Sequence, residues 1–257
     1  MDSVKAFFKY RHLVVYLVTL DLRLRYRGSF LGFTWTLLNP VLLMLVLWAV
    51  FSRFGRIQEE NYALFLLSGL MSWLFFEQSV TRGQNCIISN KALLQKIYIP
   101  KLVFPFSIFI SNLINLLFFL VAYFVIAIVT GWGVSFYYLL APFALGILFI
   151  LSSGAGLLMC SANVFFRDFT HLSSVLLRAL FYLSPILYNP SMFSERVQYY
   201  LKLNPAYYPI ISLRQLIYNA ECPTIETWLT GLILSLCIFA LGFTVFMMTE
   251  KKFLYYA

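Results

Sequence analysis

The sequence predicts an all-α integral membrane protein with six transmembrane helices, and three observations carry this prediction. The 257 residues are 61% hydrophobic and only 11% charged, whereas soluble domains are about 45–50% apolar and about 25% charged. The stretch Leu102–Phe166 contains no Lys, Arg, Asp or Glu. As a helix it would reach roughly 98 Å, about three times the thickness of a bilayer core. Further apolar stretches lie on both sides, so residues 1–257 are expected to form a single membrane domain.

The N-terminal segment, 1–27, is expected to form an amphipathic helix in the membrane interface. Its basic residues surround an apolar run, Leu13–Leu20, that is too short to span. Asp21 and Arg25 are four residues apart, which favours a helix. A basic helix with apolar Val14 and Val18 on one side is typical of a segment lying among lipid headgroups. A simple topology anchor is the alternative.

Six apolar segments follow and define the expected spans. The first contains Asn39-Pro40, where we expect a kink. The third and fourth divide the charge-free stretch at Gly131-Trp132-Gly133, which we expect to form a hairpin turn. Small residues at 152–156 favour close helix packing. The expected spans are residues 28–52, 62–81, 102–130, 134–162, 172–188 and 227–249.

The segments between spans carry their own expectations. Asn90 is expected to cap a short helix over Lys91–Ile99. The proline-rich segment 189–227 has apolar runs, which predict short re-entrant outer helices between spans five and six. Glu77 and Arg178 are each costly alone in lipid and are candidates for a pair across spans two and five.

The distribution of positive charge predicts the topology. Of the 19 Lys and Arg residues, 14 fall on one set of alternating segments, which includes both termini. The positive-inside rule therefore places the N- and C-termini in the cytoplasm. The basic excess then faces anionic lipid headgroups, so nucleic acid is not an expected partner.

Several kinds of chemistry are missing from the sequence. No G-x-x-x-x-G-K-[ST] motif occurs, so no ATP site is expected in this chain. With two histidines and four scattered cysteines, we expect no catalytic residues, metal site or cofactor. Ion-driven carriers usually use acidic or His relays at membrane depth, which the spans almost lack. If the protein transports, its energy is expected from another subunit.

Several motifs resemble one transporter family. Residues 25–32, followed by Trp35 and Pro40, are similar to the start of type-2 ABC exporter permeases, and Asn163–Asp168 resembles their motif after the fourth span. Within that group the chain resembles permeases that export O-antigen, capsule-like polysaccharide or wall teichoic acid. Ser72 departs from the pattern, because these permeases often have Pro before the Trp. Further similar positions are Leu67–Leu70, Lys96, Pro100, Pro105, Ser184–Tyr188, Asn204-Pro205 and Arg214.

The resemblance implies a permease subunit of an ATP-driven exporter in the bacterial inner (plasma) membrane. It implies a homodimer joined to two separate ABC ATPase subunits, which would bind ATP and Mg. It also implies a lipid-linked glycan as substrate, carried on an undecaprenyl-diphosphate-type lipid.

Three groups of candidate site residues follow. Two short polar segments are expected to couple to the ATPase, and arginines before the first span suit bidentate contact with a lipid diphosphate. Aromatic rings in the family-like motifs are candidates for a glycan path, although aromatics also form the common interface belt. The coupling candidates are Asn90, Lys91, Lys96, Phe166, Arg167, Asp168 and His171. The lipid-diphosphate candidates are Arg23, Arg25 and Arg27, and the glycan-path candidates are Trp35, Trp73, Phe76 and Tyr188.

Alternative functions stay open at this point. One is a type-2 permease for teichoic acid, a drug or another lipid, which would share the architecture. Another is a membrane glycosyl- or acyltransferase, for which the sequence offers neither paired acids nor a His-Asp site near an interface. A third is a non-transporting anchor subunit.

Overall fold

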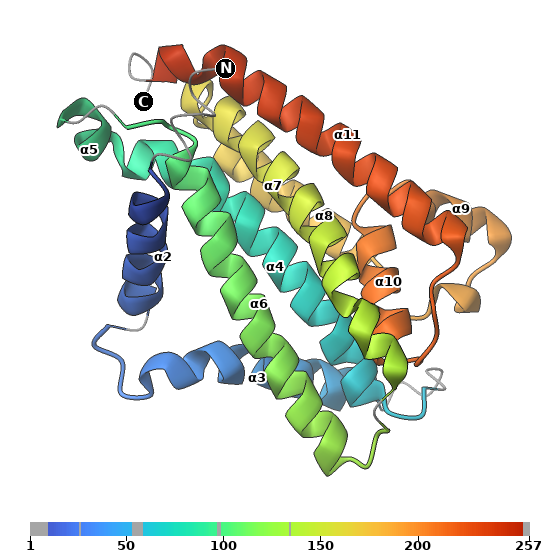
Figure 1. Cartoon of the computed structure of the whole chain (residues 1–257). Helices are drawn as coiled ribbons and strands as arrows, with labels where there is room; N and C mark the ends of the chain where they lie inside the picture. The colour runs from blue at the N-terminus through green and yellow to red at the C-terminus, as the bar shows by residue number, and fades with distance from the viewer. Residues whose placement is uncertain (1–9, 26, 53–58, 97–98, 134, 254–257) are drawn as a thin grey trace.

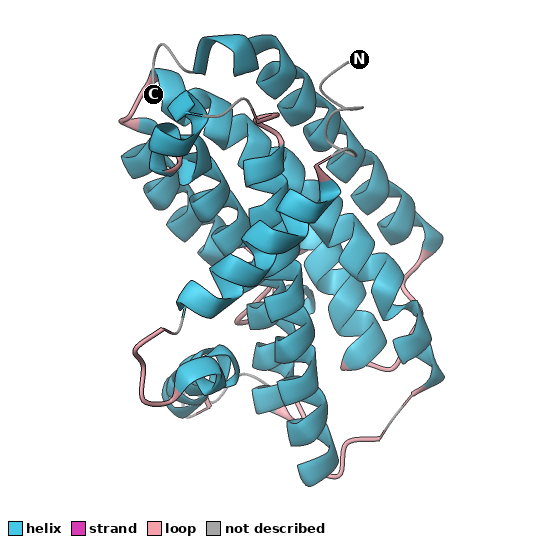
Figure 2. Ribbon diagram, turned by 60° about the vertical axis from the view of Figure 1, so that its left-hand side comes forward, coloured by secondary structure: helices cyan, strands magenta, loops and turns pink. Residues whose placement is uncertain are grey.

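The computed structural model describes residues 10–25, 27–52, 59–96, 99–133 and 135–253. These residues form helices and connecting loops, with no strand among them (Figures 1 and 2). The all-helical fold expected from the sequence is confirmed. Four helical segments are long and apolar enough to cross a membrane. They are α4 (Tyr62–Ser89), α6 (Val103–Val129), η2 with α7 (Phe136–Leu140 and Ala141–Phe165), and α11 with η4 (Ile225–Thr249 and Glu250–Lys252).

The helices form one bundle with two distinct ends. Phe253 packs in one apolar cluster with Val14 and Val18 of α2 (Arg11–Arg25), and we call this the terminal end. The turn at Gly131 and the start of α11 lie at the opposite end, which we call the far end (Figure 1). Every later position is given relative to these two ends.

Helix α4 is the centre of the bundle. Every residue from 64 to 73 is buried, and α4 packs against α3, α6, α7, α8 and α10. It is the least hydrophobic and the most buried of the four spanning segments in the described chain. A helix enclosed by protein on most sides can carry polar groups that lipid would not tolerate.

The charge-free stretch forms the expected hairpin. Its two arms, α6 and α7, are joined by a turn in which Gly131 has a φ of +73°. Only glycine adopts this left-handed conformation without strain. Each arm packs more extensively on α4 than on the other arm. The hairpin therefore holds α4 between its arms, as Figure 1 shows.

The first and fifth expected spans are shorter helices than predicted. Helix α3 (Trp35–Phe51) has 17 residues and α8 (Phe169–Leu183) has 15, which correspond to roughly 26 and 22 Å. Residues 28–31, at the start of the expected first span, are not helical, and Gly32 itself has a φ of +49°. Pro185 disfavours helical backbone at Ser184, which is extended. Pro40 lies inside α3, which crosses the bundle at a steep angle near the far end (Figures 1 and 2).

The N-terminal helix differs from the expectation in the face that it buries. Val14 and Val18 pack on protein, chiefly α6, and do not face lipid. The exposed apolar side chains of α2 are Val15, Tyr16 and Leu24, at 64%, 62% and 50%. A helix with apolar residues on two sides can contact the bundle and the membrane together. Residues 1–9 of the expected helix lie outside the described residues.

At the terminal end, α4 is longer than the expected second span. It continues through Arg82 to Ser89, and a short α5 (Lys91–Lys96) follows. Asn90 lies between the two helices. Its side-chain amide donates to the carbonyl of Cys86, 2.8 Å away, and its backbone carbonyl accepts from Leu93 and Leu94 at 3.1 Å. Its expected side-chain cap on α5 stays a prediction. Ile97 and Tyr98 of the expected helix lie outside the described residues.

The segment between α8 and α11 contains the short helices that were expected. They are η3 (Pro190–Met192), α9 (Glu195–Lys202) and α10 (Tyr207–Ile217). Helix α9 is mostly exposed, whereas α10 returns into the bundle and packs on α4, α7 and α11. The side chains of Ile210, Leu213 and Leu216 are fully buried. The re-entrant element is therefore α10, enclosed by protein.

The small residues of α7 allow the close packing that was expected. A Cβ on Gly154 would lie 2.5 Å from the Cα of Phe239 in α11. A Cβ on Gly242 of α11 would lie 2.1 Å from the carbonyl oxygen of Gly154. Between apolar helices in lipid, packing replaces the hydrophobic effect as the force of association. The contact of α7 with α11 is therefore specified by these two glycines.

Candidate functional site: polar layer of helix α4

Four polar side chains of helix α4 between Ser79 and Asn85, within its half at the terminal end, bond to other helices. Ser79 and Arg82 bond toward α2 and α6, whereas Gln84 and Asn85 face α7 and α8. We call these four residues and their bonded partners the polar layer. Through it, one helix is hydrogen-bonded to four others.

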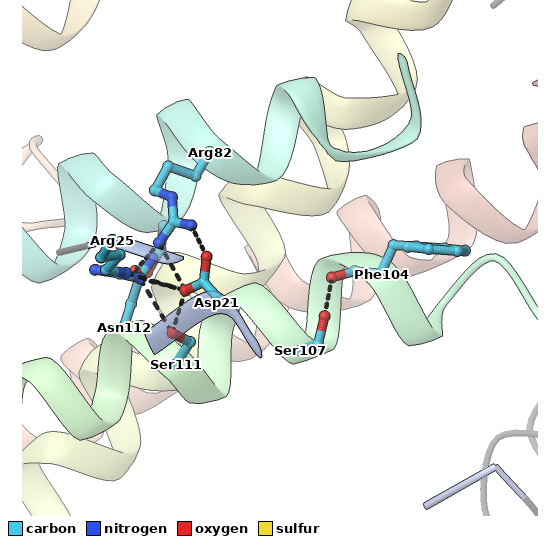
Figure 3. A network of polar contacts seen from close by, with 8 residues as sticks. Asp21, Arg25, Arg82, Phe104, Ser107, Ser111 and Asn112 are labelled. Carbon is cyan, nitrogen blue, oxygen red and sulfur yellow. Dashed lines mark hydrogen bonds and ion pairs between the residues drawn. The ribbon is translucent and has the colours of Figure 1, made fainter. Parts of the chain in front are cut away.

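The first half of the polar layer is centred on Asp21 of α2 (Figure 3). The carboxylate accepts from Nε of Arg25 at 3.0 Å and from the guanidinium of Arg82. It also accepts from the hydroxyl of Ser111 in α6. The Oδ1 of Asn112 accepts from both arginines, at 2.6 Å from Arg25 and 3.1 Å from Arg82. The expected helical pair of Asp21 with Arg25 is confirmed and belongs to a larger network.

The charges of this cluster do not cancel, since one carboxylate serves two guanidinium groups. The side chains of Arg25, Asp21 and Arg82 are 14%, 23% and 32% exposed. A partly buried charge needs partners to offset its lost hydration. Ser111 and Asn112 supply uncharged partners within a helix that has no charged residue. Asp21 is thus the only acid among the bonded partners of the two arginines in the described residues.

The second half of the polar layer is centred on the buried Asn163, near the end of α7. Its amide nitrogen donates to the carbonyl of Gln84 at 3.0 Å and to Oδ1 of Asn85 at 3.1 Å. Its Oδ1 accepts from the hydroxyl of Thr170 at 2.8 Å. Ser173 donates to Oε1 of Gln84 at 2.7 Å. Asn163 therefore fixes the turn between α7 and α8 against α4.

That turn presents its remaining side chains to the outside of the bundle. Phe166 is 65% exposed, and Arg167, Asp168 and His171 are exposed as well. An apolar cavity of about 170 Å³ lies beside them and is lined in part by Phe166 and Phe169. The surface combines charged side chains with an apolar hollow, which is the usual composition of a protein interface.

Lys101 connects the start of α6 to the terminal end of α11. Its ammonium donates to the backbone carbonyl of Glu250. Burial lowers the pKa of Lys101, and the negative charge of Glu250 opposes part of that effect. Lys96 of α5 is exposed, whereas Asn90 and Lys91 are partly buried. The predicted coupling residues thus all lie at the terminal end, with Phe166–His171 on the exposed turn (Figure 1).

Comparison with known proteins decides the family. The ABC-2 type transporter family model matches residues 12–218. The chain belongs to the ABC-2 type transporter family. It is 31% identical to the O-antigen export system permease protein RfbA of Myxococcus xanthus, over 97% of both chains. It is 29% identical to the RfbA of Klebsiella pneumoniae, over 94% of this chain and 93% of that one. It is 24% identical to the polysialic acid transport protein KpsM of Escherichia coli, over 72% and 73% of the two chains.

Membership of the ABC-2 family makes this chain a multi-pass membrane transport subunit. The predicted resemblance to type-2 ABC permeases of polysaccharide export is confirmed. Within the described residues, no three His, Cys, Asp or Glu side chains gather as metal ligands.

The three arginines predicted to meet a lipid diphosphate occupy two different environments. Arg23 and Arg27 are exposed. Arg25 points into the polar layer and is bonded to Asp21, Ser111 and Asn112. The structure therefore does not bring the three together, and in this ABC-2 chain Arg25 holds α2 in place.

The four predicted glycan-path residues are not gathered either. Trp73 and Phe76 are buried in α4, with ring centroids 5.5 Å apart. Trp35 is 39% exposed at the start of α3. Tyr188 lies after α8 and packs edge-on against Phe193. Trp73 lines a cavity, and Tyr188 packs at the edge of the apolar cluster that contains Trp73 and Phe76.

That cavity, of about 180 Å³, lies between α3, α4 and α8, and both Glu77 and Arg178 line it. The two side chains face the same space. No ion pair of 4 Å or less joins them among the described contacts. The candidate pair therefore shares a cavity without a direct bond.

Sequence reasoning missed the partners that make the polar layer. The expected second span ends at residue 81, so Arg82 falls outside it, and Ser111, Asn112 and Gln84 are not among the predicted site residues. A signal was present, because Ser111-Asn112 is a polar pair inside a span that has no charge of its own. Polar residues inside a span usually face protein.

Proposed function

We propose that this chain is the permease subunit of an ATP-driven exporter that moves a lipid-linked polysaccharide across the bacterial inner membrane. The observation that carries the proposal is the 31% identity to an O-antigen export permease over 97% of both chains. The family match over residues 12–218 includes the whole polar layer. The relatives named for polysialic acid transport support the same class of cargo.

In this proposal the terminal end faces the cytoplasm and binds a separate ABC ATPase. The charge distribution supports this orientation, because most Lys and Arg residues fall on segments that reach the terminal end. The exposed Phe166, Arg167, Asp168 and His171 form the docking surface together with α5. Two permease chains and two ATPase subunits make up the complex, and ATP and Mg bind to the ATPase.

The polar layer gives a physical route from the ATPase to the rest of the permease. A force on the turn that Asn163 fixes reaches α4 through Gln84 and Asn85. Arg82 passes it from α4 to α2 through Asp21. ATP binding can shift the permease between states only if it stabilises one arrangement of these helices more than another.

The decisive measurement is ATP turnover by the chain purified with its partner ATPase in lipid nanodiscs. We expect lipid-linked glycan from the native host to stimulate turnover several-fold, and the same lipid diphosphate without glycan to stimulate it less. If the intact complex does not respond to lipid-linked glycan but responds to another lipid or a drug, the proposed cargo is wrong.

The same ATP-turnover assay tests the exposed arginines. Arg23→Lys with Arg27→Lys keeps the charge, so a higher glycan-lipid requirement would support bidentate phosphate contact.

The docking surface makes a separate prediction. Arg167→Ala is expected to weaken ATPase binding about tenfold, since a charged hydrogen bond across an interface contributes about 1.5–3 kcal/mol. The measurement is the dissociation constant of the ATPase for nanodisc-embedded permease. Arg196→Ala, an exposed arginine on α9 near the far end, is the matched control. Equal affinities for the two variants would remove Arg167 from the interface.

A further inference from the structure

A small polar pocket lies on the far half of the bundle, between α4 and the re-entrant α10. Its volume is about 170 Å³, and its lining includes Phe65, Asn189, Tyr207, Arg214 and Gln215. It lies apart from the polar layer and from the cavity at Trp73, with which it shares no lining residue. The family resemblance and the polar layer leave this pocket without a role.

Arg214 supplies hydrogen-bond donors to this pocket. The side chain is only 3% exposed. It donates to the hydroxyl of Ser68 and to the backbone carbonyls of Pro185 and Ile186. Its guanidinium also lies 3.8 Å from the ring centroid of Phe65. Arginine has five N–H donors, so three bonds leave further donor capacity, and no carboxylate within 4 Å takes it up among the described residues.

The backbone around Arg214 is shaped to hold that guanidinium. A Cβ on Gly69 of α4 would lie 2.4 Å from Nη2 of Arg214. Glycine at this position therefore lets the guanidinium approach the helix backbone. The guanidinium contacts neutral oxygens and an aromatic face. Glu59 adds a favourable negative charge without a direct ion pair, and its carboxylate accepts from Asn189 of the same lining at 3.0 Å.

Gln215, the next residue, supplies the opposite polarity. Its Oε1 atom is buried and accepts no hydrogen bond in the described structure. Leaving a buried acceptor without a donor is destabilising. The pocket thus offers unused donors on Arg214 and an unused acceptor on Gln215, at neighbouring positions.

A hydroxyl group matches this pair, because it donates and accepts hydrogen bonds at once. A bare oxyanion would satisfy Arg214 but not the carbonyl of Gln215. The ring of Phe65 is already covered by the guanidinium, so Tyr207 is the aromatic residue of this lining that suits the apolar face of a sugar ring. At about 170 Å³, the pocket is below the range of roughly 300–1,000 Å³ for drug-sized ligands, so one ring fits and a chain does not.

We propose that this pocket is a binding site for a single hydroxylated sugar unit, with Arg214 donating to a hydroxyl and Gln215 accepting from one. The inference rests on the proposed function, since it gives part of the exported glycan a contact on the far side of the bundle. It names a subsite inside one permease chain, under α10, and does not require a second copy.

The test is protection of an introduced thiol during export. Gln215→Cys is placed in a chain with Cys222→Ser and Cys237→Ser, because these two native cysteines are exposed whereas Cys86 and Cys160 are buried. A membrane-impermeant maleimide is added to cells that make the glycan and to cells that do not. We expect labelling of the Gln215→Cys thiol to be at least threefold slower in the glycan-producing cells.

The control uses native Cys222 as the exposed thiol, in a chain with Cys237→Ser only. Cys222 is exposed and lies outside the pocket lining, so its labelling should be equal in the two strains. Asn219→Cys, on the exposed rim of the pocket, replaces Gln215→Cys if that variant fails to reach the membrane.

Gln215→Leu should lower surface polymer at least threefold at equal membrane amount, whereas Gln198→Leu on exposed α9 should not.

The outcomes separate this inference from the proposed function. If the native chain exports polymer and the Gln215→Cys thiol is labelled equally in both strains, the pocket holds only water and the inference is wrong. If the native chain exports no polymer, the proposed function itself is wrong. Slower labelling at Cys222 as well would show general shielding of the surface and would also overturn the sugar site.

Discussion

Gly242→Ala is expected to be among the most destabilising single-methyl changes in this chain. The added Cβ would lie 2.1 Å from the carbonyl oxygen of Gly154 and 3.0 Å from its carbonyl carbon, and both atoms belong to backbone. Backbone cannot rotate aside as a side chain can, so α7 and α11 must separate. Overpacking of this kind costs about 1–3 kcal/mol and occasionally more. We expect about 3 kcal/mol, measured as the free energy of unfolding in detergent, and a lower yield of folded protein.

Gly146→Ala is the matched control, on α7 eight residues before Gly154. Nothing lies within 4 Å of a Cβ at Gly146, and alanine favours a helix over glycine by about 0.8–1.0 kcal/mol. This variant should be as stable as the native chain or slightly more so. If the two variants unfold alike, the close contact of α7 with α11 does not determine stability.

Asp21→Asn is expected to release α2 from the bundle while the spanning helices stay folded. The change leaves Arg25 and Arg82 without their shared carboxylate, in positions only 14% and 32% exposed. Removing one partner of a fully buried pair costs about 3–5 kcal/mol. Because these side chains are partly exposed, we expect on the order of 2 kcal/mol. Hydrogen exchange of the α2 amides should rise while the amides of α6 and α7 stay protected.

Loss of the Asp21 contacts should also lower export. If Asp21 links α2 to α4, export by Asp21→Asn should fall at least fivefold at equal membrane amount. Exchanging the charges, Asp21→Arg with Arg82→Asp, should recover part of it, whereas each single change should not. Glu221→Gln removes an exposed acid instead and should leave both α2 exchange and export unchanged. Fast α2 exchange in the native chain would contradict the docking of this helix.

The spans could be predicted because a helix that crosses lipid must be long and nearly free of charge. The stretch from Leu102 to Phe166 lacks charge, so its two crossings and the Gly131 turn follow from length alone. The predicted bounds of the spans were wrong where a side chain contacts protein instead of lipid or water. The expected second span ends at residue 81 because Arg82 is charged and a charge usually ends a span, but Asp21 and Asn112 accept the hydrogen bonds of Arg82. The helix therefore continues for two more turns.

The candidate site was predictable only in part, for a related reason. The motif Asn163–Asp168 marked an exposed turn, and its exposed members lie on the surface that we propose for docking. The different roles of the residues in this motif were not predictable, since Asn163 bonds to Gln84 and Asn85, 78 or more positions away. Likewise, the spacing of Arg23, Arg25 and Arg27 does not reveal that the middle one points inward. Such roles depend on which helix stands opposite, and a single sequence does not contain that information.

The central place of α4 has a consequence for how the chain is made. It is the least hydrophobic of the four long helical segments described, and its polar groups are satisfied by helices that are synthesised both before and after it. When α4 leaves the ribosome, the groups of α6, α7 and α8 do not yet exist. Its partition into lipid must therefore stay incomplete until the following hairpin arrives. Membrane integration of this protein is then a concerted event of several helices, with α4 held beside the insertion machinery until its partners enclose it.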